Sequence, residues 1–316
     1  AINPQITQKV NLQKSGTSAA YSDGVSSTIL MESEKKVASN FKAIAGVNLI
    51  DANLFLALPT GKNSSLQLAG RSSLNSVFTT PTYDSYFDRV TQDTEVEENV
   101  EKIINSDKTF GFFDTSLRWL YEISKKDNIR VNFLYVNNKL SFTENATEID
   151  RPISRESSVR QNSLGAGIFY ERKWNDKVAS TVQLYESDYK LEAINANVLD
   201  SQRFLQENSV SETGVKTITA ISLDRNEKLS LGYQLLETKV TNLDDVDNPQ
   251  IRSLIAEVVR THSGFAEIEL RSKNKKTSLR GGLRYNYLDK FKESIIEPRL
   301  HISHKLSDKI TVEGAA

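Results

Sequence analysis

Strict alternation of apolar and polar residues is the feature that most constrains the fold of this chain. Residues 113–123 divide into two sets that occupy opposite faces of an extended strand. One set is Phe113, Thr115, Leu117, Trp119, Tyr121 and Ile123, and the other is Asp114, Ser116, Arg118 and Glu122, with Leu120 as the exception. A helix would scatter these sets around its axis, whereas a strand separates them. The segment therefore predicts a β-strand with one apolar and one polar face.

The alternation recurs throughout the chain. Residues 129–135, 229–235 and 279–287 repeat it clearly. This density of alternating segments is typical of an all-β chain, with about thirteen strands. We expect the strands near 40–49, 52–59, 64–72, 109–123, 129–141, 162–173, 178–190, 214–224, 229–240, 256–271, 277–287, 294–305 and 310–316.

The predicted connections alternate between two kinds. Short polar turns rich in Asn, Asp, Gly and Lys occur at 60–63, 125–128, 174–177, 225–228, 273–276 and 306–309. The connections between them are mostly long, at 73–108, 142–161, 191–213 and 241–255, with short ones at 50–51 and 288–293. Helical spacing of Val96, Val100, Ile103 and Ile104 predicts a helix within 81–108. In a meander this order places all the long loops at one end, as in an outer-membrane β-barrel.

Alternation alone does not distinguish a membrane barrel from a soluble sandwich, because both have one apolar face. Three features favour the barrel. Many strands reach the roughly 9–11 residues that cross a bilayer, aromatic residues lie near strand ends, and arginines occur in mid-strand. We therefore expect an outward, lipid-facing set and an inward, luminal set. The outward set is Leu117, Trp119, Phe133, Leu231 and Leu283, and the luminal set is Arg118, Arg130, Gln234 and Arg284.

Composition excludes several classes of function. The formal net charge of -1 provides no basic footprint for nucleic acid. The absence of cysteine removes disulfides and thiolate chemistry. His301 and His304 have opposite parity on one predicted strand, so they do not share a metal. We predict no enzyme activity, no catalytic residue, no metal site and no cofactor.

Three segments in order resemble TonB-dependent outer-membrane receptors of the Bacteroidetes type. Residues 6–29 read ITQKVNLQKSGTSAAYSDGVSSTI and resemble the end of the plug domain, where Tyr21, Gly24 and Ile29 match the plug-to-barrel junction. Residues 52–92 look like the early barrel of this family. Residues 297–312 read EPRLHISHKLSDKITV and resemble a strand pair in the middle of its barrel.

The resemblance implies a division of the chain and an incomplete barrel. Residues 1–36 would form the C-terminal end of the plug domain, and residues 37–316 the first part of an antiparallel transmembrane barrel of about 22 strands. We therefore expect the strands near 40–49 and 310–316 to be two unpaired edges. The most useful further observation would be whether a plug and a TonB box precede Ala1.

The resemblance also implies a function. Such a chain would belong to a transporter in the outer membrane of a Gram-negative bacterium that takes up a scarce siderophore, cobalamin, glycan or peptide. Its partners would be the inner-membrane TonB complex, acting through the missing N-terminal part, the lipid bilayer and an extracellular ligand. Expected ligand contacts are Phe78, Tyr83, Tyr86 and Phe87, although packing of their loop is the stronger interpretation. A passive porin-like barrel and a soluble all-β binding or adhesion module remain alternatives.

Overall fold

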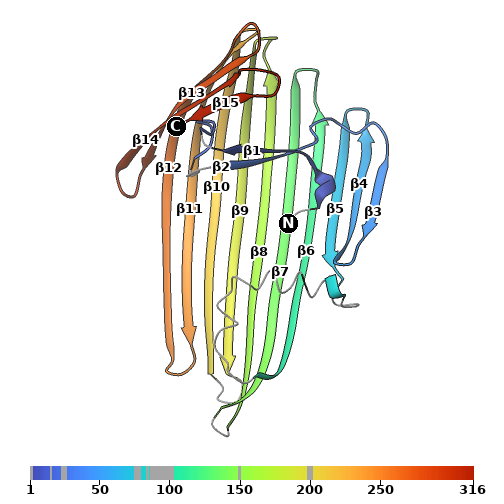
Figure 1. The fold of residues 1–316 in the computed structure, drawn as a ribbon, viewed down its shortest axis with the longest axis vertical. Helices are drawn as coiled ribbons and strands as arrows, with labels where there is room; N and C mark the ends of the chain where they lie inside the picture. Colours follow the sequence, from blue (N-terminus) through green and yellow to red (C-terminus); the bar gives the residue numbers. More distant parts are fainter. Residues whose placement is uncertain are drawn as a thin grey trace.

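Thirteen strands form one antiparallel sheet in the computed structural model, each paired with its neighbours in chain order from β3 to β15 (Figure 1). The structure describes residues 3–14, 16–22, 27–74, 80–82, 85, 103–148, 151–197 and 202–316. The strands are β3 Lys42–Val47, β4 Asp51–Gly61, β5 Ser64–Ser73, β6 Ile103–Glu122, β7 Asp127–Glu148, β8 Arg151–Lys173, β9 Val178–Asn197, β10 Gln202–Asp224, β11 Glu227–Val246, β12 Ile251–Arg271, β13 Thr277–Leu288, β14 Glu293–Lys305 and β15 Thr311–Ala315. The predicted all-β meander is confirmed.

A second, two-stranded sheet lies across the concave side of the large sheet (Figure 1). It pairs β1, Thr7–Lys14, with β2, Ser27–Ser33, and a 3₁₀ turn at Pro4–Ile6 precedes it. Ile6 and Ala38 pack against buried Phe55, Ala57 and Ala69 on the inner side of β4 and β5. The N-terminal part of the chain is thus held inside the curved wall.

The outer connections differ from those predicted. Residues 142–161, 191–213 and 241–255, expected to be long loops, belong mostly to strands, so that only 149–150, 198–201 and 247–250 separate β7 to β12 at that end. Alternation is weak in these stretches, yet the pairing of each strand with its neighbours continues through them. Strand β6 begins at Ile103, so Ile103 and Ile104 of the expected helix belong to a strand instead, whereas Val96 and Val100 lie outside the described residues. Pro81, Thr82 and Ser85, earlier in the expected loop 73–108, are helical.

The predicted division between outward and luminal side chains is confirmed. Leu117, Phe133, Leu231 and Leu283 are exposed on the convex side, and Trp119 stacks on Tyr121 there with ring centroids 5.4 Å apart. The four side chains that were predicted to face the lumen also lie on the concave side of the sheet. Arg118, Gln234 and Arg284 are buried there, and Arg130 stacks on Phe169 at 4.7 Å.

The two edges of the sheet are β3 and β15, and they are not paired with each other among the described residues. The wall is therefore open in this structure, as expected. None of the described helices is long and apolar enough to cross a membrane.

Candidate functional site

The candidate site is the contact between the wall and residues 16–21, which we call the docking segment. It lies against the concave face of β10, β12, β13 and β14, through side chains from each of these strands. Arg280 and Arg284 of β13 donate to the carbonyl oxygens of Gly16 and Ala19, the latter at 3.3 Å, and Lys216 of β10 donates to Ala20 O. Three cations of the wall thus hold backbone carbonyls that have no strand partner.

One carboxylate complements these cations. Glu267 of β12 is buried and accepts hydrogen bonds from the Ala19 amide at 2.7 Å and the Ser18 hydroxyl at 2.9 Å. Hydrogen bonds to an ionised acceptor are about twice as strong as neutral ones. Glu267 therefore fixes the donors of the segment while the cations fix its acceptors.

A second layer of polar groups orients Arg284, which is 1% exposed. Its Nη2 donates to Gln234 Oε1 at 2.9 Å, and its Nε donates to Asn286 Oδ1 at 2.8 Å. Asn286 in turn donates to Glu297 Oε1 at 2.6 Å. A buried cation is tolerated only when such partners replace water.

Two glycines allow the close approach. Gly16 has a φ of +48°, which L-residues with side chains rarely adopt, and a Cβ there would lie 2.5 Å from Leu300 O. On the wall, a Cβ at Gly282 would lie 2.8 Å from Ala19 Cβ, and Ala19 itself is fully buried. The segment therefore fits a shallow recess made by the missing side chain of Gly282.

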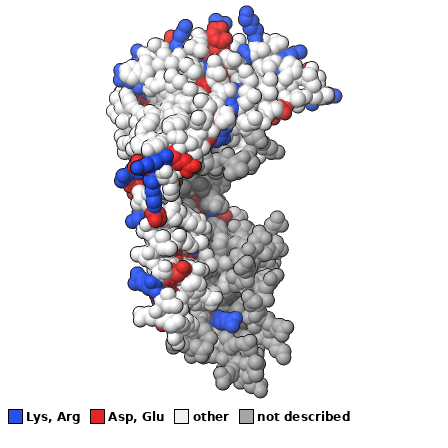
Figure 2. Space-filling view, turned by 90° about the vertical axis from the view of Figure 1, so that its left-hand side faces the viewer, with Lys and Arg blue, Asp and Glu red and all other residues white. Residues whose placement is uncertain are grey.

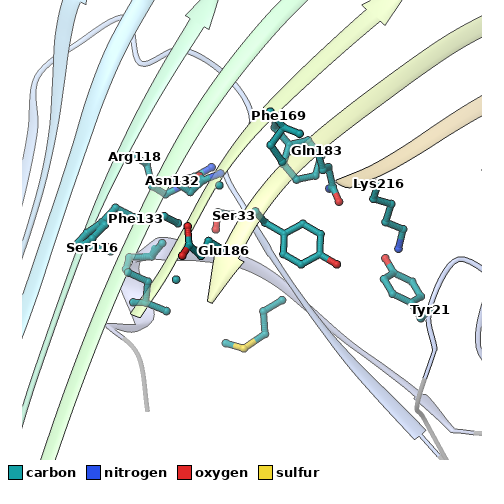
Figure 3. Close-up of a pocket in the computed structure, with 18 of the residues that line it drawn as sticks. Tyr21, Ser33, Ser116, Arg118, Asn132, Phe133, Phe169, Gln183, Glu186 and Lys216 are labelled. Atoms are coloured by element: carbon teal, nitrogen blue, oxygen red, sulfur yellow. Dashed lines mark hydrogen bonds between the residues drawn. The ribbon is translucent and has the colours of Figure 1, made fainter. Parts of the chain in front are cut away.

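Tyr21, predicted at the plug-to-barrel junction, lies at the end of the docking segment. Lys216 Nζ is 4.7 Å from its ring centroid, a cation–π distance, and the two side chains face each other in Figure 3. Burial, and then the negative charges of Glu32 and Glu267, raise the pKa of Tyr21 above its ordinary value. Ile29, the second junction residue, is exposed on β2, and Gly24 lies outside the described residues.

A second set of contacts anchors the chain on either side of β1 and β2. Arg118 of β6 donates to Glu34 O at 2.9 Å and to Gln67 Oε1 at 2.8 Å. Asn3 is fully buried, and its side-chain Nδ2 donates to Leu54 O at 3.2 Å and to Gly70 O at 3.1 Å. The N-terminal part thus contacts two separate regions of the concave face, one on β4 to β6 and the other on β10 to β14.

A cavity of about 700 Å³ lies between the two-stranded sheet and β6 to β11 (Figure 3). Its lining combines polar groups with apolar and aromatic surface, including Tyr21, Met31, Phe169, Gln183, Tyr185 and Lys216.

Sequence analysis identified some of these residues and missed others. Arg118 and Arg284 were correctly predicted to face the lumen, but their contacts with the N-terminal part were not foreseen. Lys216 and Glu267 were missed, and their only signal was a charge within an alternating strand. The predicted ligand contacts Phe78, Tyr83, Tyr86 and Phe87 lie outside the described residues.

The geometry defines a class of protein, a transmembrane-type β-barrel wall with an N-terminal segment docked in its lumen. Comparison with solved structures finds a similar fold in structures of TonB-dependent receptors. The chain is similar to the ferric enterobactin receptor PfeA of Pseudomonas aeruginosa, with a TM-score of 0.67, 13% identity, and 98% of this chain and 48% of the other covered. It is also similar to the copper transporter OprC, with a TM-score of 0.64, 11% identity, and 97% and 49% covered.

A third structure extends the comparison. The FpvAI–pyocin S2 complex contains a chain that matches with a TM-score of 0.67 and 11% identity, covering 99% of this chain and 47% of the other. The chain thus spans about half the length of the structures it matches. Scans against protein-family models and curated proteins found no match. At these identities the comparison establishes the fold.

Proposed function

We propose that this chain is part of a TonB-dependent transporter in the outer membrane of a Gram-negative bacterium. Residues 1–36 are the C-terminal end of its plug domain, and residues 37–316 the first part of its barrel. The observation that carries this proposal is the docking segment. Three wall cations and Glu267 hold its backbone inside the lumen, and a passive porin has no need of such a segment.

The chemistry of the contact supports a segment that moves. The wall holds residues 16–21 mainly by hydrogen bonds, and their donors and acceptors can pair with water after release. In the proposed mechanism, ligand binds at the outer face, the inner-membrane TonB complex pulls the plug, and the docking segment separates from Lys216 and Arg284. The cavity beside Tyr185 then widens into a passage for the ligand.

The proposed ligand is a scarce solute that needs energised uptake. The similar structures are a ferric enterobactin receptor in complex with enterobactin, a copper transporter, and FpvAI in complex with pyocin S2. Phe78, Tyr83, Tyr86 and Phe87, between β5 and β6, are the proposed aromatic contacts for ligand. The transporter uses no enzyme chemistry in this account.

Uptake measurements test the proposal directly. Cells carrying the intact protein would be supplied with radiolabelled ferric siderophore, cobalamin, oligosaccharide or peptide, with and without a proton-motive-force uncoupler. We expect uptake of one of these ligands that is lost on uncoupling and on deletion of the inner-membrane TonB protein. Uptake that needs this protein but persists in uncoupled cells would instead identify a passive pore.

A further inference from the structure

The end of the wall that carries the tight turns has a strongly positive charge. The six short connections and the strand residues next to them lie at 60–63, 122–128, 172–178, 224–228, 271–277 and 305–309. They contain fourteen lysine and arginine residues and six aspartate and glutamate residues, a net charge of +8, whereas the whole chain has -1. Figure 2 shows lysine and arginine side chains along the upper end of the molecule, where these turns lie in Figure 1. The rest of the chain is therefore net negative, and charge is separated along the wall.

Aromatic side chains lie on the convex face just inside this positive end. Register places Tyr121 of β6, Ile129 of β7 and Tyr170 of β8 side by side across three strands. Trp119, on the same face of β6, stacks on Tyr121 with ring centroids 5.4 Å apart. Aromatic side chains gather at the level where a lipid bilayer meets water. The apolar part of the convex face therefore ends at this row.

One position beyond the aromatic row, Arg172 is the centre of a polar cluster on the convex face. It lies opposite Asp127 of β7, and its Nη1 donates to Asp127 Oδ1 at 3.1 Å. Its guanidinium carbon is 4.7 Å from the ring centroid of Trp174, a cation–π distance. Trp174 Nε1 donates to Ser180 Oγ at 3.1 Å, which holds the indole beside the wall. The Arg172 side chain remains 42% exposed and Trp174 is 54% exposed, so both can contact a further group.

Two lysines extend the cluster toward the end of the wall. Lys125 and Lys126 belong to the β6–β7 turn, immediately before Asp127, and both are exposed. The Lys173 amide donates to Lys126 O at 2.8 Å, so this turn lies directly beside the end of β8. The cluster thus combines several exposed cations with an exposed indole, at the boundary of the apolar surface.

The position of the cluster determines what can cover it. Strand β8 lies five strands from the β3 edge of the sheet and seven from the β15 edge, with paired neighbours on both sides. Further strands of a longer chain would continue the wall at those edges, and the N-terminal part contacts the concave side. Neither covers the convex face of β7 to β9. The exposed apolar residues of this face, such as Ile168 and Val182, instead match the acyl chains of a lipid bilayer.

We propose that Arg172, Lys125 and Lys126 bind the phosphate of an anionic phospholipid headgroup, with Trp174 beside the upper part of its acyl chains. Guanidinium and ammonium groups donate strong hydrogen bonds to phosphate oxygens. Each cation close to an anionic membrane surface strengthens the attraction roughly fivefold. Phosphatidylglycerol carries the net negative charge that this end of the wall attracts, and zwitterionic phosphatidylcholine does not. That this lipid leaflet faces the periplasm rests on the proposed function, whereas the site requires only that the convex face meets lipid.

Quenching of Trp174 fluorescence tests the site in purified full-length protein reconstituted in vesicles. The vesicles contain phosphatidylcholine and phosphatidylglycerol in a fixed ratio, and bromine atoms on the acyl chains of one lipid or the other quench nearby indoles. The Trp174 signal is the difference between the wild-type protein and Trp174→Phe. We expect phosphatidylglycerol to be enriched at least fivefold beside Trp174, relative to its ratio in the vesicles. Equal quenching per molecule by the two lipids would overturn the proposal.

Two variants that remove the same charge localise the binding. Lys125→Gln/Lys126→Gln removes two exposed cations of the cluster and should reduce the enrichment to less than twofold. Lys273→Gln/Lys276→Gln removes two cations from the β12–β13 turn, which contains no aromatic residue, and should leave the enrichment unchanged. An equal loss in the two variants would indicate a diffuse attraction to the whole positive end and would contradict a site at Arg172.

The central cation and the lipid itself are tested in the same assay. Arg172→Gln should also reduce the enrichment to less than twofold. Asp127 keeps its hydrogen bonds from Tyr170 Oη and Ser124 Oγ, each 2.7 Å long, so the strand ends should stay folded. Replacing chloride by inorganic phosphate at equal ionic strength should leave the wild-type enrichment unchanged, and its loss would assign the site to free phosphate and overturn the proposal. None of these measurements involves uptake, so the proposed function is tested separately.

Discussion

At the scale of single residues, charge pairing between the wall and the backbone is the central feature. Lys216, Arg280 and Arg284 are directed at carbonyl oxygens, and Glu267 is directed at an amide and a hydroxyl. Charged side chains on the inner face of such a wall need either water or hydrogen-bond partners, because burying an unpaired charge costs free energy. This explains why charged residues occur in mid-strand without destabilising the sheet.

Replacing Glu267 tests the strength of this contact. Glu267→Gln removes the negative charge that accepts hydrogen bonds from the Ala19 amide and the Ser18 hydroxyl. A hydrogen bond to a charged group contributes about 1.5–3 kcal/mol, so the docking segment should open about ten- to a hundredfold more often. Hydrogen exchange at the Ala19 amide measures this directly.

Glu269→Gln is the matched control for that change. Glu269 lies two residues further along the same face of β12, and its ion pair with Lys228 is exposed at both ends. Its replacement should leave exchange at Ala19 unchanged. Equal exchange in the two variants would show that Glu267 does not hold the segment.

At the scale of the strand, the outward face of the wall has two parts. An apolar band lies near the tight turns, and charged residues follow it toward the other end of the long strands. Strands β6 to β12 are 20 to 23 residues long, about twice what crosses a bilayer. Outward residues near the tight turns are apolar, as at Leu184 and Leu231. Further along β9, Lys190 pairs with Glu207 of β10 at 2.7 Å. The outward apolar residues therefore cover only the part of each long strand that lies near the tight turns.

Arginine scanning along one strand pair tests this boundary. Leu184→Arg places a charge within the band and should destabilise the protein in lipid vesicles by about 2–4 kcal/mol. Ser209→Arg lies on the outward face of β10 beyond the band, opposite Lys190, and should change stability by less than about 1 kcal/mol. Denaturant unfolding in vesicles gives both values. A similar cost at the two positions would place the membrane elsewhere.

The same boundary explains how far the sequence predicts the strands. Where lipid meets one face and the lumen the other, alternation marks each strand, as in residues 113–121. Beyond the apolar band, residues such as Ser154 to Ser158 no longer alternate, although they pair with β9 or β7. Backbone hydrogen bonds to the adjacent strands continue each strand there. The side-chain pattern of the sequence does not predict these bonds.

At the scale of the whole molecule, the wall and its docked segment form one unit. The inward direction of Lys216 follows from alternation, but the backbone that it meets does not. The bond from Lys216 to Ala20 spans 196 positions in the chain, and that from Arg284 to Ala19 spans 265. Such contacts depend on how far the sheet curves, which local sequence does not specify. Resemblance of residues 6–29 to a plug end was the signal that placed this segment in the lumen.

A disulfide test addresses the central claim, that residues 16–21 lie on the luminal face of a wall whose other face meets lipid. The chain has no cysteine, so introduced pairs react without background. In Ala19→Cys/Gly282→Cys an added Cβ at Gly282 starts 2.8 Å from that of Ala19, so an outward shift of the docking segment by about 1 Å brings the two Cβ atoms to the roughly 3.5–4.5 Å separation of a disulfide, which forms under mild oxidation. In Ala19→Cys/Gly281→Cys the second cysteine points to the opposite face of β13. We predict a disulfide-dependent shift in gel mobility for membranes carrying the first pair and none for the second. Equal crosslinking of the two pairs, or none in either, would contradict the account.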